Sequence, residues 1–124
     1  MQHKESRFEM LAHPIQRWIW QQGWTSLNEI QEKSIPIILK GDTDVVISAA
    51  TAGGKTEAAF LPILSSVIND SNKGCKVLYI SPLKALINDQ YRRLSDLTAV
   101  TKTSITPWHQ DISISKKIQF IESP

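Results

Sequence analysis

The sequence predicts a three-layer α/β domain with a mainly parallel sheet. Three short, largely apolar runs alternate with three segments of helical periodicity, and this order is typical of such domains. The first run is almost continuously apolar, which suits a parallel strand covered on both faces. The strands are expected at 44–48, 76–80 and 104–108, and the helices that follow them at 55–69, 83–97 and 115–122.

Two further helices are expected before the first strand. One begins at Pro14, because proline is well suited to the first helical turn. The other begins at a capping box, Ser26-Leu27-Asn28-Glu29, and runs to Lys40, with Gly41 as its stop. Pro36 should kink or shorten this second helix.

Apolar residues at helical spacing define the faces that should pack inward. In the first helix after a strand they are Ala58, Leu61, Leu64, Val67 and Ile68. In the next helix they are Leu83, Leu86, Ile87, Tyr91, Leu94 and Leu97.

Composition limits the class of protein. With 124 residues, 41% hydrophobic and 21% charged, the chain can form one globular domain with a sizeable core. It has no apolar run near the length of a membrane span and no signal-peptide layout, so we expect no membrane partner. The single cysteine, Cys75, is expected to be a packed thiol in a reducing cytoplasm. A net charge of +2 does not by itself indicate nucleic-acid binding.

Residues 49–56, Ala-Ala-Thr-Ala-Gly-Gly-Lys-Thr, have the layout of a phosphate-binding loop between a strand and a helix. Gly53 and Gly54 let backbone N–H groups approach a phosphate chain. Lys55 would reach the β- and γ-phosphates of a nucleotide, and the Thr56 hydroxyl would bind Mg²⁺. The strict pattern has glycine where this chain has Ala49. The plainer alternative is a strand–turn–helix with a solvated lysine.

Three other segments accompany this loop. Residues 23–31 read Gly-Trp-Thr-Ser-Leu-Asn-Glu-Ile-Gln, residues 81–86 read Ser-Pro-Leu-Lys-Ala-Leu, and residues 108–113 read Trp-His-Gln-Asp-Ile-Ser. With residues 49–56, they make the chain resemble the N-terminal part of superfamily 2 helicases. The likeness is greatest to the large helicase-related (Lhr-like) group of DEAD/DEAH-box enzymes, and it extends over roughly residues 8–113.

The resemblance implies a RecA-like fold and an ATP site that uses Mg²⁺. Helicase motif I tolerates alanine at its first position, so residues 49–56 fit it, and Thr51 and Ala52 would join Gly53 to Thr56 around the phosphates. Gln31 would pair with N6 and N7 of adenine, because its amide offers one donor and one acceptor. Phe8 would stack on the base, with a core position as an equal alternative.

The same resemblance implies contacts with the phosphate backbone of single-stranded or duplex nucleic acid. Ser81, Pro82, Leu83 and Lys84 match helicase motif Ia, which uses a helix N-terminus and a basic side chain. A simple helix start, with Ser81 as the cap, is compatible with that role. His109 and Asp111 match the His-Gly-Asp segment of Lhr-like enzymes, with Gln110 in place of glycine. A metal site at this pair would need a third ligand, and none has suitable spacing.

By this resemblance, residues 1–124 are a partial first RecA-like domain. Residues 1–41 form a helical adenine-reading segment, and residues 42–124 form the β-α repeats. The acidic helicase motif and a second RecA-like domain are missing from this sequence. Such a truncated piece should bind nucleotide weakly, hydrolyse it negligibly and be marginally stable or self-associating.

Two other functions remain open at this point. The chain could belong to another P-loop enzyme, such as a small-molecule kinase, in which only the phosphate loop is functional. It could also be a non-catalytic truncated binding module. The helicase interpretation accounts for the segments at 23–31 and 81–86, which a kinase has no reason to carry.

Overall fold

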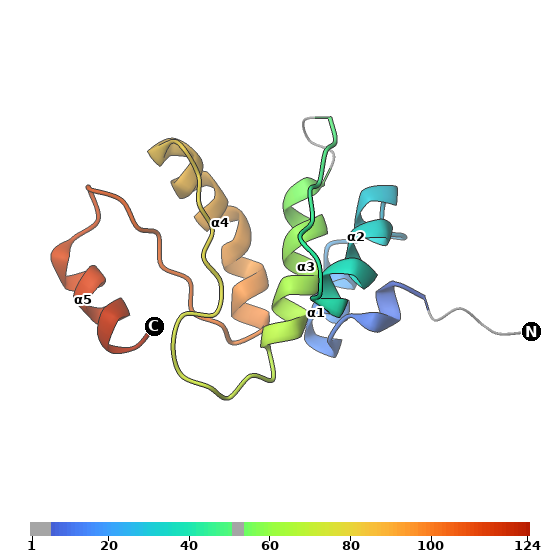
Figure 1. Cartoon of the computed structure of the whole chain (residues 1–124), viewed down its shortest axis with the longest axis horizontal. Helices are drawn as coiled ribbons and strands as arrows, with labels where there is room; N and C mark the ends of the chain where they lie inside the picture. The colour runs from blue at the N-terminus through green and yellow to red at the C-terminus, as the bar shows by residue number, and fades with distance from the viewer. Residues whose placement is uncertain (1–5, 51–53) are drawn as a thin grey trace, which may run out of the picture. The chain divides into compact units, whose positions relative to one another are not determined.

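A computed structural model describes residues 6–50 and 54–124, and their regular structure is helical (Figure 1). The chain divides into two compact units, one ending at Asn69 and the other beginning at Asp70. The elements are a 3₁₀ turn η1 (Phe8–Met10) and helices α1 (His13–Gln21), α2 (Glu29–Lys40), α3 (Lys55–Val67), α4 (Lys84–Val100) and α5 (Ile114–Glu122).

The first unit is built around the contact between α2 and α3. The Ser34 hydroxyl of α2 donates to the carbonyl of Ala58 in α3 at 2.6 Å, so the two backbones approach closely. The N–H of Ala12, just before α1, donates to the Ser65 hydroxyl of α3 at 3.0 Å. The core residues of this unit are Leu11, Ile15, Trp18, Ile19, Leu27, Ile35, Ala58, Phe60, Leu61 and Leu64.

The predicted inward face of α3 is confirmed for Ala58, Leu61 and Leu64, whereas Val67 and Ile68 are only half-buried. Proline lies in the first turn of α1, and Gly41 ends α2 with a φ of 70°, both as predicted. Pro36 lies inside α2, but the helix continues beyond it to Lys40.

The capping box of α2 lies two residues later than predicted. Its members are Asn28 and Gln31, not Ser26 and Glu29. The Gln31 N–H donates to Asn28 Oδ1 at 2.9 Å, and the Asn28 N–H donates to Gln31 Oε1 at 3.1 Å. Both pairs satisfy the three-residue spacing, but the later register also buries Leu27, which directly precedes the cap.

In the second unit, α4 buries only its C-terminal half, through Leu94, Leu97 and Thr98. The N-terminal part of the predicted stripe is exposed, at Leu83, Leu86 and Tyr91. Before α5, the Trp108 ring makes an edge contact with Phe120 at 5.9 Å and lies under the Lys117 ammonium at 5.3 Å.

The three segments expected as strands are not strands in the described part of the chain. Val46 is 94% exposed, and Leu78 and Ile80 are about as exposed, at 79% and 80%. A parallel strand is stabilised by a hydrogen-bonded neighbour and by helices on both faces. Here the apolar side chains lack that cover, so the expected parallel sheet does not form among the described residues.

Cys75 is exposed, which corrects its expected packed position. It precedes the segment 76–80, and without a sheet there is no interior for the thiol to enter. Among the described residues, none of the helices combines the length and apolarity needed to span a bilayer.

Candidate nucleotide and nucleic-acid site

The N-terminus of α3 carries the second half of the predicted phosphate loop. Gly54 is the N-cap, with a left-handed φ of 78°, and Lys55 and Thr56 are the first helical residues. The first N–H groups of a helix have no intrahelical carbonyl partners, which favours anion binding at this end. The predicted contributions of Thr51, Ala52 and Gly53 lie outside the described residues.

Lys55 reaches back to the start of the predicted loop. Its Nζ donates to the carbonyl of Ala49 at 3.1 Å, and its side chain is exposed. The ammonium group therefore lies beside Ala49, the first residue of the predicted loop. A phosphate bound there would replace one backbone carbonyl as the acceptor.

Gly54 lies directly against the capping box of α2. A Cβ at this glycine would come within 2.6 Å of Asn28 Nδ2 and 2.8 Å of Gln31 Nε2. At distances below 3 Å the two amide groups would have to shift to admit a methyl group, so a side chain here conflicts with the capping box as well as with the left-handed φ. The segment predicted to read adenine and the predicted phosphate loop thus meet at Gly54.

The Gln31 side chain is 4% exposed. Its Oε1 accepts the hydrogen bond of the capping box, and its Nε2 faces Gly54. Adenine pairing by this amide stays a prediction, since it would require the carbonyl oxygen to serve the base as well as the cap. Asn28 was not predicted as a site residue; its position three residues before Gln31 was the available signal.

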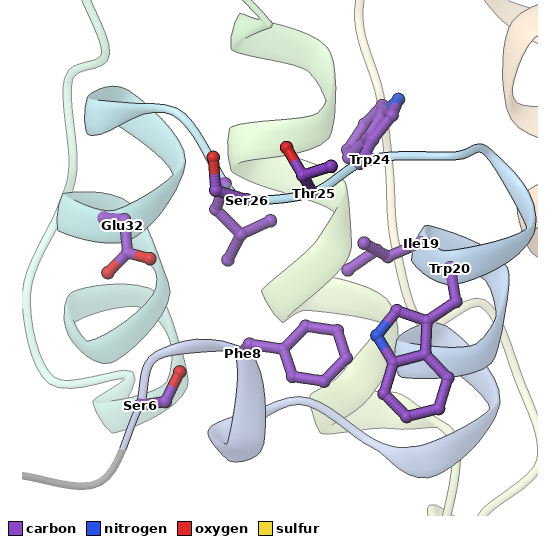
Figure 2. Close-up of a pocket in the computed structure, with 9 residues that line it drawn as sticks. Ser6, Phe8, Ile19, Trp20, Trp24, Thr25, Ser26 and Glu32 are labelled. Carbon is purple, nitrogen blue, oxygen red and sulfur yellow. The ribbon is translucent and has the colours of Figure 1, made fainter.

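A hollow of about 280 Å³ lies beside α1 and the start of α2 (Figure 2). Phe8 and Trp20 form one side of it, with stacked rings whose centroids are 5.6 Å apart and whose planes differ by 21°. Trp20 is 66% exposed and was not predicted as a site residue. The lining residues are Ser6, Phe8, Ile19, Trp20, Trp24, Thr25, Ser26, Leu27 and Glu32.

Ser81, Pro82 and Leu83 precede α4, which begins at Lys84. The N-cap is Leu83, without a side-chain hydrogen bond, so Ser81 is not the cap that the sequence suggested. A residue two positions before the N-cap is outside the position from which a hydroxyl reaches the first turn. The Lys84 ammonium forms an ion pair with the Asp111 carboxylate.

His109 and Asp111 each contact a residue of α4, and they also contact each other. One ring nitrogen of His109, Nε2, lies 3.0 Å from Asn88 Oδ1, and the Asp111 N–H donates to His109 Nδ1 at 3.2 Å. The hydrogen bond and the charge of Lys84 lower the pKa of Asp111 below its ordinary value. Asp111 is therefore ionised at neutral pH.

Among the described residues, no cluster of three or more His, Cys, Asp and Glu side chains could hold a metal ion. Thr56, predicted to bind Mg²⁺, lies in the first turn of α3 next to Lys55. A single hydroxyl at this position suits a hard cation that also takes oxygens from phosphates.

A Gly-Lys-Thr sequence at the N-terminus of a helix is the arrangement of phosphate-binding-loop proteins. The chain belongs to the DEAD/DEAH box helicase family, whose model matches residues 28–123. This family has a RecA-like fold, so the chain belongs to the α/β class even though its described residues are helical.

Similar proteins include three helicases. An ATP-dependent helicase Lhr-Core of Sulfolobus acidocaldarius is 38% identical over 73% of this chain, which corresponds to 11% of that relative. The DEAD-box ATP-dependent RNA helicase RhpA of Helicobacter pylori is 32% identical over 97% of the chain and 24% of the relative. Probable ATP-dependent RNA helicase DDX52 of Bos taurus is 35% identical over 77% of the chain and 16% of the relative.

The chain thus spans at most about a quarter of the length of these curated relatives. No solved structure matches the chain.

Proposed function

We propose that this chain is the N-terminal part of the ATP- and nucleic-acid-binding domain of a helicase or translocase. Lys55 and Thr56 would hold the β- and γ-phosphates and Mg²⁺, with Thr51 to Gly54 cradling the phosphate chain. Phe8 and Gln31 would hold adenine. The β-α repeats would form a mainly parallel sheet once neighbouring strands cover the segments 44–48, 76–80 and 104–108.

The observation that carries the proposal is the contact between Gly54 and the two amide side chains of α2. Asn28 and Gln31 come within 2.6 Å and 2.8 Å of the Gly54 Cβ position. A ligand whose phosphates lie on the N-terminus of α3 would therefore lie within reach of the amide groups of Asn28 and Gln31. A nucleotide has this bipartite form, whereas inorganic phosphate does not.

Contacts with nucleic acid would come from the N-terminus of α4 and from Lys84, through the phosphate backbone. Ser81, Pro82 and Leu83 would guide the strand past this end. Contacts to phosphates carry no base information, so this part of the site would accept DNA and RNA alike.

The single exposed thiol at Cys75 suits a protein that works in a reducing cytoplasm.

Binding of a fluorescent ATP analogue tests the nucleotide site. Lys55→Ala should weaken binding about tenfold or more, because it removes a charge-assisted hydrogen bond to phosphate. Lys33→Ala is the matched control, since Lys33 is an exposed lysine of α2 that pairs with Glu29. It removes the same charge and should leave binding unchanged.

Equal binding by wild type and Lys55→Ala would contradict the proposal. ATP hydrolysis in a longer protein that contains this chain separates helicases from other P-loop enzymes. If the longer protein is a helicase, we expect single-stranded nucleic acid to stimulate its ATP hydrolysis. The kinase alternative has no support among the relatives named above, which are all helicases.

A further inference from the structure

The segment between α4 and α5 is attached to α4 at two points one helical turn apart. Asp111 forms an ion pair with Lys84, and His109 lies 3.0 Å from Asn88. Lys84 and Asn88 are four residues apart, so both side chains project from the same face of α4. The lysine expected to hold a strand phosphate therefore already has an anionic partner within its own unit.

The hydrogen-bond pattern defines the tautomer of His109. The backbone N–H of Asp111 can only donate, so Nδ1 of His109 must be the acceptor at 3.2 Å. The ring proton is then on Nε2, from where it donates to Asn88 Oδ1. His109 thus joins the backbone of Asp111 to Asn88 of α4, while the Asp111 carboxylate contacts Lys84 separately.

Asp111 is poorly suited to contact a strand directly. Its carboxylate is ionised at neutral pH, since Lys84 lowers its pKa, and a phosphate oxygen carries the same sign of charge. Two like charges at hydrogen-bond distance repel each other. Lys84 cannot present the same N–H groups to a carboxylate and to a phosphate, so the two anions compete for it.

We propose that Asp111 takes the place of a strand phosphate on Lys84 in the free chain and is displaced from Lys84 when a single strand binds. Asp111 then lowers the affinity for nucleic acid without contacting it. The His109–Asn88 contact keeps the segment attached while the carboxylate turns away. This inference rests on the proposed nucleic-acid contact of Lys84.

The strength of the ion pair sets the size of the effect. The Lys84 and Asp111 side chains are 45% and 58% exposed, so water screens their attraction. Exposed pairs of this kind are weak enough that removing the competitor should raise affinity by only about two- to fivefold.

The test is the anisotropy of a fluorescein-labelled oligothymidylate titrated with the 124-residue chain at low ionic strength. Asp111→Asn should bind about two- to fivefold more tightly than wild type. Asp96→Asn, at an exposed residue of α4, removes the same charge and should change affinity less. Lys84→Met should bind more weakly than wild type.

The double variant decides the mechanism. If Asp111 acts through Lys84, the gain from Asp111→Asn should disappear in the Lys84→Met background. A gain that persists there would show that the carboxylate merely repels the strand, which overturns the inference. A weakened Lys84→Met with no gain in Asp111→Asn overturns the inference but leaves the proposed function intact. No binding by wild type, or equal binding by Lys84→Met, overturns both.

A second measurement needs no variant. The carboxyl ¹³C signal of Asp111 in the wild-type chain reports its titration midpoint, which should lie below the ordinary value when the chain is free. Saturation with oligothymidylate should raise the midpoint, because Lys84 is then occupied by phosphate. An unchanged midpoint in the bound chain would mean that the ion pair persists, and the inference would be wrong.

Discussion

Gly54 is the residue at which two parts of the candidate nucleotide site constrain each other. The sequence predicts a glycine that admits phosphate, and that requirement concerns the loop alone. The structure adds a second requirement, because Asn28 and Gln31 occupy the volume that a side chain would need. No pattern of residue types within 49–56 could have revealed it, since the partners are more than twenty residues away in the sequence.

We predict that Gly54→Ala destabilises the first unit more than Gly23→Ala does. Both glycines have a left-handed φ, 78° and 77°, so both variants lose about 1–2 kcal/mol from backbone strain. At Gly54 the new methyl group must also displace two amide side chains of the capping box, which adds roughly 1 kcal/mol. Urea unfolding followed by circular dichroism measures both losses.

Gly23 is a matched control because nothing lies within 4 Å of its Cβ position. Equal losses for the two variants would indicate that Asn28 and Gln31 move aside at no cost. In that case the contact with α2 would place no restriction on the phosphate loop.

Among the elements, α2 shows which features of a helix the sequence determines locally. Its stop at Gly41 depends on one residue in a left-handed conformation, and the sequence predicts it correctly. Its start was predicted two residues early because Ser26–Glu29 and Asn28–Gln31 both have the spacing of a capping box. The choice depends on the burial of Leu27, Gln31 and Ser34, which is a tertiary contribution.

Asn28→Ala should destabilise the first unit by about 1 kcal/mol, because the Gln31 N–H loses its acceptor. Ser26→Ala should change stability by much less, since Ser26 is not the N-cap of α2. Thermal unfolding of the two variants, compared with wild type, checks this. A larger loss for Ser26→Ala would mean that the helix begins at the earlier box.

The contrast between locally determined features and features that depend on tertiary contacts also separates the helices of the chain from its predicted strands. Helices α3, α4 and α5 begin within a residue of their predicted starts, because a helix forms its hydrogen bonds within itself. The segments 44–48 and 76–80 have suitable residues for strands, but their hydrogen bonds must come from other segments. The Lys84–Asp111 pair was unpredictable for a similar reason, because it depends on how 109–111 returns to α4.

For the whole molecule, we predict a sharp difference in amide hydrogen exchange. Amides in α2 and α3 of the 124-residue chain should exchange slowly, because these helices pack against each other. Amides of 44–48 and 76–80 should exchange at nearly unprotected rates, because these segments are not in a ladder. Mass spectrometry of peptic fragments measures both.

The control for this hydrogen-exchange measurement is a longer protein that contains the rest of the helicase domain. There, both segments should become protected as neighbouring strands pair with them. Protection of 44–48 in the 124-residue chain itself would contradict the absence of a sheet. It would also remove the reason to expect self-association through the exposed apolar residues Val46, Leu78 and Ile80.

The short hydrogen bond between Ser34 and the Ala58 carbonyl has a consequence for ligand length. Helix α2 carries Asn28 and Gln31, α3 carries Lys55 and Thr56, and the small residues Ser34 and Ala58 hold the two helices close together. The separation of the two helices sets the reach between the base end and the phosphate end of a ligand that spans them. In the proposed nucleotide site, the Ser34 hydroxyl would therefore fix how far the base end lies from the phosphate end.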